Sequence, residues 1–174
     1  MTVARLLLCL VSMMWAGLCA SAPAADNAAA AREVVRKESL GGLHLDQPVS
    51  EVIKLLGKPE KETKLIFQEA DGNYVQTWKY PSKGIELGIS AGAKPTGRKT
   101  VASITANAPC QLATQRGIKI GSPATLARKT YAAWADRDTP PAPDAFVVAS
   151  IYGGIIFHFE RGQVNRIFFG AAAE

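Results

Sequence analysis

The chain has 174 residues, of which 48% are hydrophobic and 20% charged, and its formal net charge at pH 7 is +5. This length suits one domain or two small fused ones. The positive charge is spread along the chain, and its densest cluster, Lys94, Arg98 and Lys99, lies among Gly and Pro residues typical of a loop. Solvated loop charges explain this cluster better than nucleic-acid binding does, so nucleic acid is not expected as a partner.

The N-terminus is typical of a cleaved secretory signal. A single arginine supplies a short positive segment, residues 6–18 form a nearly unbroken apolar run, and residues 21–25 provide small side chains for a signal peptidase. The apolar run is shorter than the about 20 residues that span a bilayer comfortably. We therefore expect residues 1–25 to be a signal peptide that is cut after Ala24 or Ala25.

Export also decides how the cysteines are interpreted. A lipid anchor on Cys19 is disfavoured, because Leu18 is larger than the residue that lipoprotein signals carry before their acylated cysteine. Cys9 and Cys19 leave with the signal peptide, so Cys110 remains without a partner for an internal disulfide in an oxidising compartment. No second long apolar stretch follows, and we expect a periplasmic or secreted protein whose mature chain has no transmembrane segment.

Residues 26–41 form an alanine-rich N-terminal segment, which predicts a short helix or a frayed tail. The first folded unit then covers residues 42–110. Pro48 marks a helix start, and the apolar residues of 49–56 follow the spacing of one helical face. The strands expected after this helix cover residues 63–69, 73–80, 85–90 and 101–106.

The second unit covers residues 111–174. Its helix is expected over residues 123–134, followed by a loop at 136–144 whose three prolines exclude regular structure. The strands expected after this loop cover residues 146–152, 155–160 and 164–169.

The two units repeat each other in outline. Residues 42–57 return at 117–131 with an offset of 75 residues, and Gly84 matches Gly154 with an offset of 70. Length changes between such copies are tolerated in loops. The pattern predicts an α+β fold of two tandem repeats, each a helix packed on an antiparallel meander of three or four strands.

The chain resembles one known superfamily in three short motifs that follow a signal peptide and occur in two copies. They are a Gly-apolar-x-apolar entry, a helix that ends in Leu-Gly-x-Pro, and a meander that contains glycine. The superfamily contains the β-lactamase inhibitor protein and the small lipoproteins of the outer-membrane β-barrel assembly machinery. The resemblance covers about residues 40–170 and implies a non-enzymatic binding or scaffolding module. This chain departs from the inhibitors, which carry a disulfide in each repeat, and from the lipoproteins, which carry an acylated cysteine.

Aromatic residues are the main candidates for binding. Tyr74, Trp78 and Tyr80 share one face of a predicted strand, and they form either an exposed contact platform or the core beneath the first helix. On the last predicted hairpin, Ile156 and His158 face outward if the residues alternating with them face a helix, and they then form a contact patch. We take these five residues as speculative binding residues.

The chain offers few residues for chemistry. Cys110 with His44 or His158 could form a thiol hydrolase site, but no cysteine motif accompanies them and a buried thiol explains Cys110 more simply. The glycine-rich segment 92–100 approaches a phosphate-binding loop, but a strand follows it where a helix is required. With two histidines far apart in the sequence, we expect no metal and no other cofactor.

These observations favour a non-catalytic module of the bacterial envelope that binds another envelope or secreted protein. Two alternatives stay open: a secreted hydrolase or thiol enzyme that uses Cys110 with a histidine, and a structural envelope protein without a discrete partner. The identity of the partner and the oligomeric state have no signal in the sequence.

Overall fold

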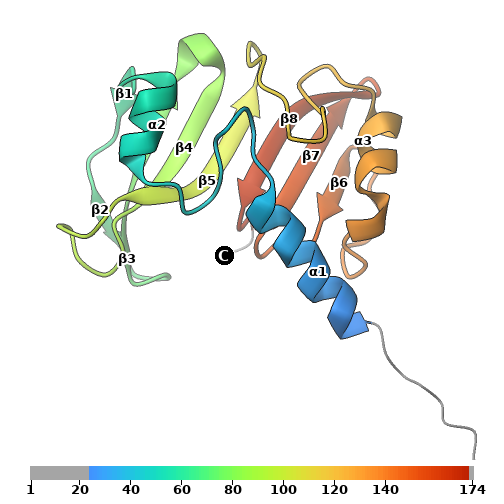
Figure 1. Cartoon of the computed structure of the whole chain (residues 1–174), viewed down its shortest axis with the longest axis horizontal. Coiled ribbons are helices and arrows are strands. Elements are labelled where there is room, and N and C mark those ends of the chain that lie inside the picture. The colour runs from blue at the N-terminus through green and yellow to red at the C-terminus, as the bar shows by residue number, and fades with distance from the viewer. Residues whose placement is uncertain (1–23, 173–174) are drawn as a thin grey trace, which may run out of the picture.

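The computed structural model describes residues 24–172 and has an α+β fold with one antiparallel sheet (Figure 1). The expected signal peptide therefore lies outside the described residues, except that Ala24 and Ala25 begin the first helix. The sheet has eight strands in the order β1-β3-β4-β5-β8-β7-β6, and β2 also pairs with β3. The strands are β1 (Lys61–Glu62), β2 (Ile66–Gln68), β3 (Asn73–Tyr80), β4 (Ile85–Ser90), β5 (Thr100–Asn107), β6 (Ala145–Val148), β7 (Gly154–Glu160) and β8 (Gln163–Gly170).

One strand pairing joins the two halves of the chain. β5 and β8 lie side by side in antiparallel register, with Ile104 opposite Phe169 and Ala106 opposite Ile167. Each half was predicted as a meander with its own helix, and the sequence did not predict that the meanders would share a ladder. β5 is an edge strand of the first meander and β8 is an edge strand of the second. Because they hydrogen-bond to each other, neither edge is left open.

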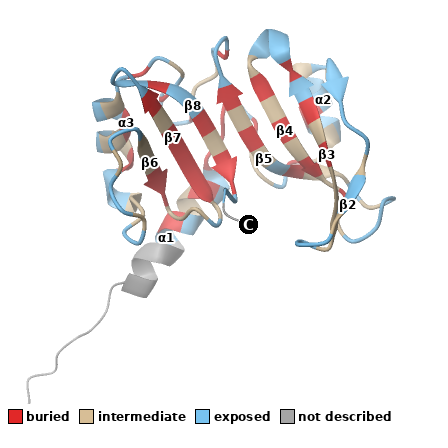
Figure 2. Ribbon diagram, turned by 180° about the vertical axis from the view of Figure 1, so that it is seen from behind, coloured by how far each residue is buried: buried red, intermediate tan, exposed pale blue. Residues whose placement is uncertain are grey.

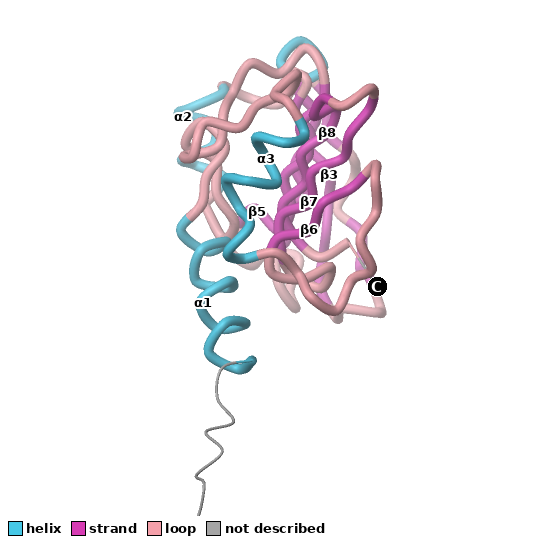
Figure 3. The backbone as a smooth tube through the Cα atoms, turned by 90° about the vertical axis from the view of Figure 1, so that its right-hand side faces the viewer, coloured by secondary structure: helices cyan, strands magenta, loops and turns pink. Residues whose placement is uncertain are grey.

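Three α-helices lie on one face of the sheet, as the side view shows (Figure 3). They are α1 (Ala24–Lys37), α2 (Val49–Leu56) and α3 (Ala124–Tyr131), with 3-10 turns η1 (Pro81–Lys83) and η2 (Ala132–Trp134). The alanine-rich segment is thus a helix from its start to Lys37. No helix between residues 24 and 172 combines the length and the apolar character needed to cross a membrane.

The sequence signals for α2 and α3 are confirmed. Each helix follows an extended proline, Pro48 with ψ 137° and Pro123 with ψ 136°, whose fixed φ favours the first helical turn. Gly57 ends α2 with φ 85°, a conformation that glycine adopts without steric cost. Strands β3, β4, β5, β7 and β8 also lie where the alternating patterns predicted them.

Two strands are shorter than predicted. The stretch predicted as a strand over 63–69 is regular only in β2, and the stretch over 146–152 is regular only in β6. Ala149 has φ 70°, which an extended strand does not contain, so β6 ends before it. β-branched and aromatic residues beyond Val148 therefore belong to a turn.

The core lies between the helices and the sheet. Leu87 and Ile104 of the first half and Phe157 and Phe169 of the second half are all fully buried and belong to one continuous cluster. The helices contribute Val52, Ala127 and Tyr131 to it. Burial of these side chains is the main force that holds the two layers together.

Leu87→Ala should lower the free energy of unfolding by about 2–5 kcal/mol, because it removes buried methyl groups and leaves a cavity in the shared core. Urea denaturation followed by circular dichroism measures this loss. Leu126→Ala is the matched control, since Leu126 is 46% exposed on α3, and it should change stability by less than about 0.5 kcal/mol. Equal losses in both variants would contradict the assigned core.

Candidate functional site

The aromatic row of β3 belongs to the core and not to an exposed platform. Trp78 is 5% exposed and Tyr80 is fully buried, so of the two alternatives that the sequence left open they belong to the core, and they are not available as binding residues. The Tyr80 hydroxyl donates to the Gly57 carbonyl at 3.1 Å, and burial raises the pKa of Tyr80. Tyr74 alone is half-buried, with its ring 5.1 Å from that of Phe67. The alternation predicted the shared face correctly, but packing between helix and sheet covers it.

The predicted patch on the last hairpin is also corrected. Ile156 lies on the side of β7 away from the helices, yet it is only 6% exposed because Val147 and Phe168 flank it on the neighbouring strands. His158 is half-buried, and burial followed by the nearby Arg166 charge lowers its pKa. Figure 2 shows this burial along β7 from the side without helices.

Cys110 is 2% exposed and lies in the hydrophobic core. Burial raises the pKa of its thiol, whereas a nucleophilic cysteine needs a lowered pKa and access to substrate. His44 instead contacts the carbonyl of Leu45 through Nδ1 at 2.8 Å. Within residues 24–172, no group of three or more His, Cys, Asp or Glu side chains is placed to hold a metal ion.

The opposite side of the sheet, here called the helix-free face, carries no helix among the described residues (Figure 3). Alternation along each strand assigns its side chains, because the residues between them lie in the core. From β3 across to β7 the face contains Val75, Thr77, Lys79, Glu86, Gly88, Ser103, Thr105, Arg166, Phe168, Ile156 and His158.

The two halves of this face differ in character. Near β3 and β4 it is polar, with Lys79 and Glu86 forming an ion pair at 3.0 Å. Near β7 and β8 it is apolar around half-buried Phe168, with exposed Arg166 beside it on β8. Gly88 and Ser103 are among the residues that line a hollow of about 390 Å³, and Ser103 Oγ lies so close to Gly88 that a Cβ there would collide with it.

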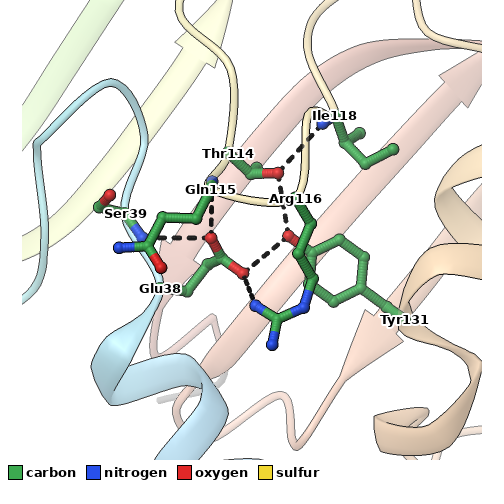
Figure 4. Close-up of polar contacts among 7 residues, drawn as sticks. All are labelled: Glu38, Ser39, Thr114, Gln115, Arg116, Ile118 and Tyr131. Atoms are coloured by element: carbon green, nitrogen blue, oxygen red, sulfur yellow. Dashed lines mark hydrogen bonds and ion pairs between the residues drawn. The ribbon is translucent and has the colours of Figure 1, made fainter.

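A second polar site lies between α1 and the start of the second half (Figure 4). Glu38 is fully buried, and its carboxylate accepts hydrogen bonds from the backbone N–H of Gln115 at 2.7 Å and of Ser39 at 3.3 Å. The other carboxylate oxygen accepts from the Tyr131 hydroxyl at 3.0 Å and forms an ion pair with Arg116. Four donors therefore compensate for the burial of this charge.

The groups around Glu38 are themselves held in place. Thr114 Oγ1 lies 3.0 Å from the Tyr131 oxygen and accepts from the backbone N–H of Ile118 at 3.1 Å. Because Tyr131 has one hydroxyl proton and directs it to the carboxylate, the Thr114 hydroxyl is the donor to Tyr131. Burial is the largest cause that raises the pKa of Tyr131, so its hydroxyl keeps this proton. The Arg116 guanidinium lies 4.7 Å from the centre of the Trp134 ring.

Sequence reasoning missed this network. Glu38 and Arg116 are separated by 78 residues, so no helical or cross-strand spacing connects them. Glu38 also follows a basic helix end, where an exposed acidic residue is an ordinary expectation. Only the antiparallel passage of Leu40 beside Thr114 brings the two segments together.

Comparison with protein-family models, with curated proteins and with solved structures found no match to this chain. The resemblance to the superfamily of the β-lactamase inhibitor protein therefore stays a prediction from short turn and core motifs.

Arg116→Met should lower the free energy of unfolding by about 3–5 kcal/mol, because it leaves the fully buried Glu38 carboxylate without its charged partner. Glu38→Gln should cost less, about 1–3 kcal/mol, because the Arg116 side chain that it leaves is 32% exposed and water solvates it. Urea denaturation measures the loss. Glu33→Gln is the control on the same helix: its ion pairs with Arg36 and Lys37 are solvent-exposed, and we expect little change. A loss for Glu33→Gln as large as for Glu38→Gln would contradict this assignment.

Cys110 should react with an aromatic disulfide reagent at least about tenfold more slowly in the folded mature chain than in denaturing urea, because its thiol is buried. Its raised pKa also means less thiolate at a given pH, so the rise of the folded-state rate with pH should be displaced to higher pH than that of the unfolded chain. Stopped-flow absorbance at several pH values measures both effects. Fast labelling near neutral pH would indicate an accessible, activated thiol.

Proposed function

We propose that this protein is an exported, non-catalytic module that binds another envelope protein through the helix-free face of its sheet. The observation that carries the proposal is the composition of that face. Half-buried Phe168 lies beside exposed Arg166 on one strand, in a sheet whose three described α-helices lie on the other side. Aromatic and arginine side chains are enriched at protein interfaces.

Three features support a protein ligand over a small one. The apolar part of the face runs across three strands, β6, β7 and β8, through Val147, Ile156 and Phe168. The polar part around the Lys79–Glu86 ion pair has the composition of an interface rim. The hollow lined by Thr77, Gly88 and Ser103 gives one side chain of a partner a place to enter.

We also propose that the two halves are tandem copies of one unit. Asp46 and Gly121, at the offset of 75 residues seen in the sequence, both have positive φ values of 62° and 85°. Their backbone N–H groups donate to the carbonyls of Val101 and Val164, at 2.8 and 2.7 Å. Val101 and Val164 are themselves equivalent positions in the proposed repeat.

Two further correspondences support the same proposal. The Gln47 side chain accepts from the His44 backbone N–H at 3.2 Å, and the Ser122 side chain accepts from the Lys119 backbone N–H at 3.0 Å. The register shifts after Gly88 in β4, and it shifts after His158, 70 residues later, in β7. Turns and bulges at equivalent places favour duplication over chance similarity of short motifs.

The rival proposal of a thiol enzyme has less support. Burial of Cys110 and its raised pKa both act against a thiolate nucleophile. A structural envelope protein without a discrete partner should give many crosslinked products of different mass in intact cells. A specific binder should give one dominant crosslinked product.

Arg166→Glu combined with Phe168→Ser should reduce capture of the crosslinked partner by at least about tenfold, because it reverses a charge and removes an aromatic contact at the proposed centre of the interface. Affinity capture of the mature protein from an envelope extract, with quantitative mass spectrometry of the partner, measures this. Circular dichroism verifies that the variant is folded.

Lys54→Glu combined with Leu126→Ser is the matched control, since both residues are exposed on the helix side. It makes the same kind of change on the opposite face, and capture should stay within about twofold of the wild type. Loss of capture in this control, with retention in the Arg166/Phe168 variant, would place the interface on the helices and overturn the proposal.

A further inference from the structure

The groups that hold Glu38 form a receptor that does not depend on α1 for its own geometry. Three of the four donors, the Gln115 backbone N–H, the Arg116 guanidinium and the Tyr131 hydroxyl, come from residues far from α1 in the sequence, and the fourth is the backbone N–H of the neighbouring Ser39. Tyr131 is held by Thr114, and Arg116 lies over the Trp134 ring. Such preorganised donors recognise a carboxylate with two oxygens.

Few of the side chains described on α1 are buried. Among the side chains described on this helix, Ala31 and Val35 are buried, whereas Ala30, Arg32, Arg36 and Lys37 are exposed. Beyond the helix end, the attachment consists of the Glu38 carboxylate, the Ser39 carbonyl, which accepts from the Gln115 backbone N–H at 3.1 Å, and the fully buried Leu40. Isolated helices of this length are marginally stable in water, so α1 depends on this attachment.

We propose that Gln115, Arg116 and Tyr131 form a carboxylate-binding site that α1 occupies through Glu38 as a detachable strap. Elements with few buried apolar contacts open at lower free energy than the core of a protein. Opening uncovers the site and the surface beneath Ala31 and Val35. A helical segment of a partner with the same chemistry then competes for this place.

The spacing of the contacts defines what such a segment carries. Ala31, Val35 and Glu38 lie at positions i, i+4 and i+7, which is one helical face ending in a carboxylate. The site therefore selects a helix with two small apolar residues one turn apart and an acidic residue at its C-terminal end. This inference does not depend on the proposed role of the helix-free face.

Native-state hydrogen exchange of the wild-type mature chain tests whether α1 detaches. The amides of α1 should exchange at least about tenfold faster than those of β7, through an opening that low urea concentrations barely accelerate. NMR spectroscopy resolves the two sets of amides. If α1 and β7 exchange with the same free energy and the same urea dependence, α1 opens only on global unfolding and the proposal fails.

A peptide probe tests whether the site binds a carboxylate in trans. The probe is a fluorescent peptide of residues 26–39, and the receptor is the full mature chain with Glu38→Gln, in which the strap has lost its charge. The peptide should bind this variant at least about tenfold more tightly than it binds the wild type, because the occupied site is blocked in the wild type. Fluorescence anisotropy measures binding.

Two controls distinguish recognition of the carboxylate from nonspecific binding of the peptide. The same peptide carrying Glu38→Gln should not bind, and the chain carrying both Glu38→Gln and Arg116→Met should not bind the original peptide. Equal binding of both peptides, or no binding to a folded Glu38→Gln chain, would show that the network is only a structural ion pair. If circular dichroism shows that the Glu38→Gln chain is unfolded, hydrogen exchange of the wild type alone decides whether α1 detaches.

Discussion

The antiparallel pairing of β5 with β8 is the constraint on which the rest of the structure depends. It makes one sheet from two groups of strands that follow one another in the chain. On one side of the sheet it places Ile104 and Phe169 opposite each other, so the two halves share a single core. On the other side it makes the helix-free face continuous from Lys79 to His158. Without this ladder, each half would be a meander with an open edge.

The Glu38 network secures the same junction from the helix side. Gly41 donates to the carbonyl of Ala113 at 2.9 Å, which places the end of α1 against the entry to the second half. The Glu38 carboxylate is buried away from water, and it accepts hydrogen bonds from donors of that half in place of water. A charge buried in this way gives a specific position to the helix, because any other position would leave the fully buried Glu38 carboxylate without its donors. The same specificity makes the site suitable for recognition of an acidic group.

The helices and most strands could be predicted from the sequence because their signals are local. Pro48 and Pro123 start helices through their own backbone restriction, and Gly57 ends one through its own conformational freedom. The site could not be predicted in the same way. Alternation along β3 showed that Trp78 and Tyr80 share a face, but which face is exposed depends on where a helix packs.

The sequence by itself determined most of the elements, the ends of two helices and the alternation that divides each strand into two faces, since these depend on residues within one or two turns of each other. Only the tertiary structure decided that the two meanders share one sheet, that Ile156 is covered by Val147 and Phe168, and that Glu38 meets Arg116 across 78 residues of chain. Contacts of this kind depend on the packing of distant segments, for which the sequence carries no local signal.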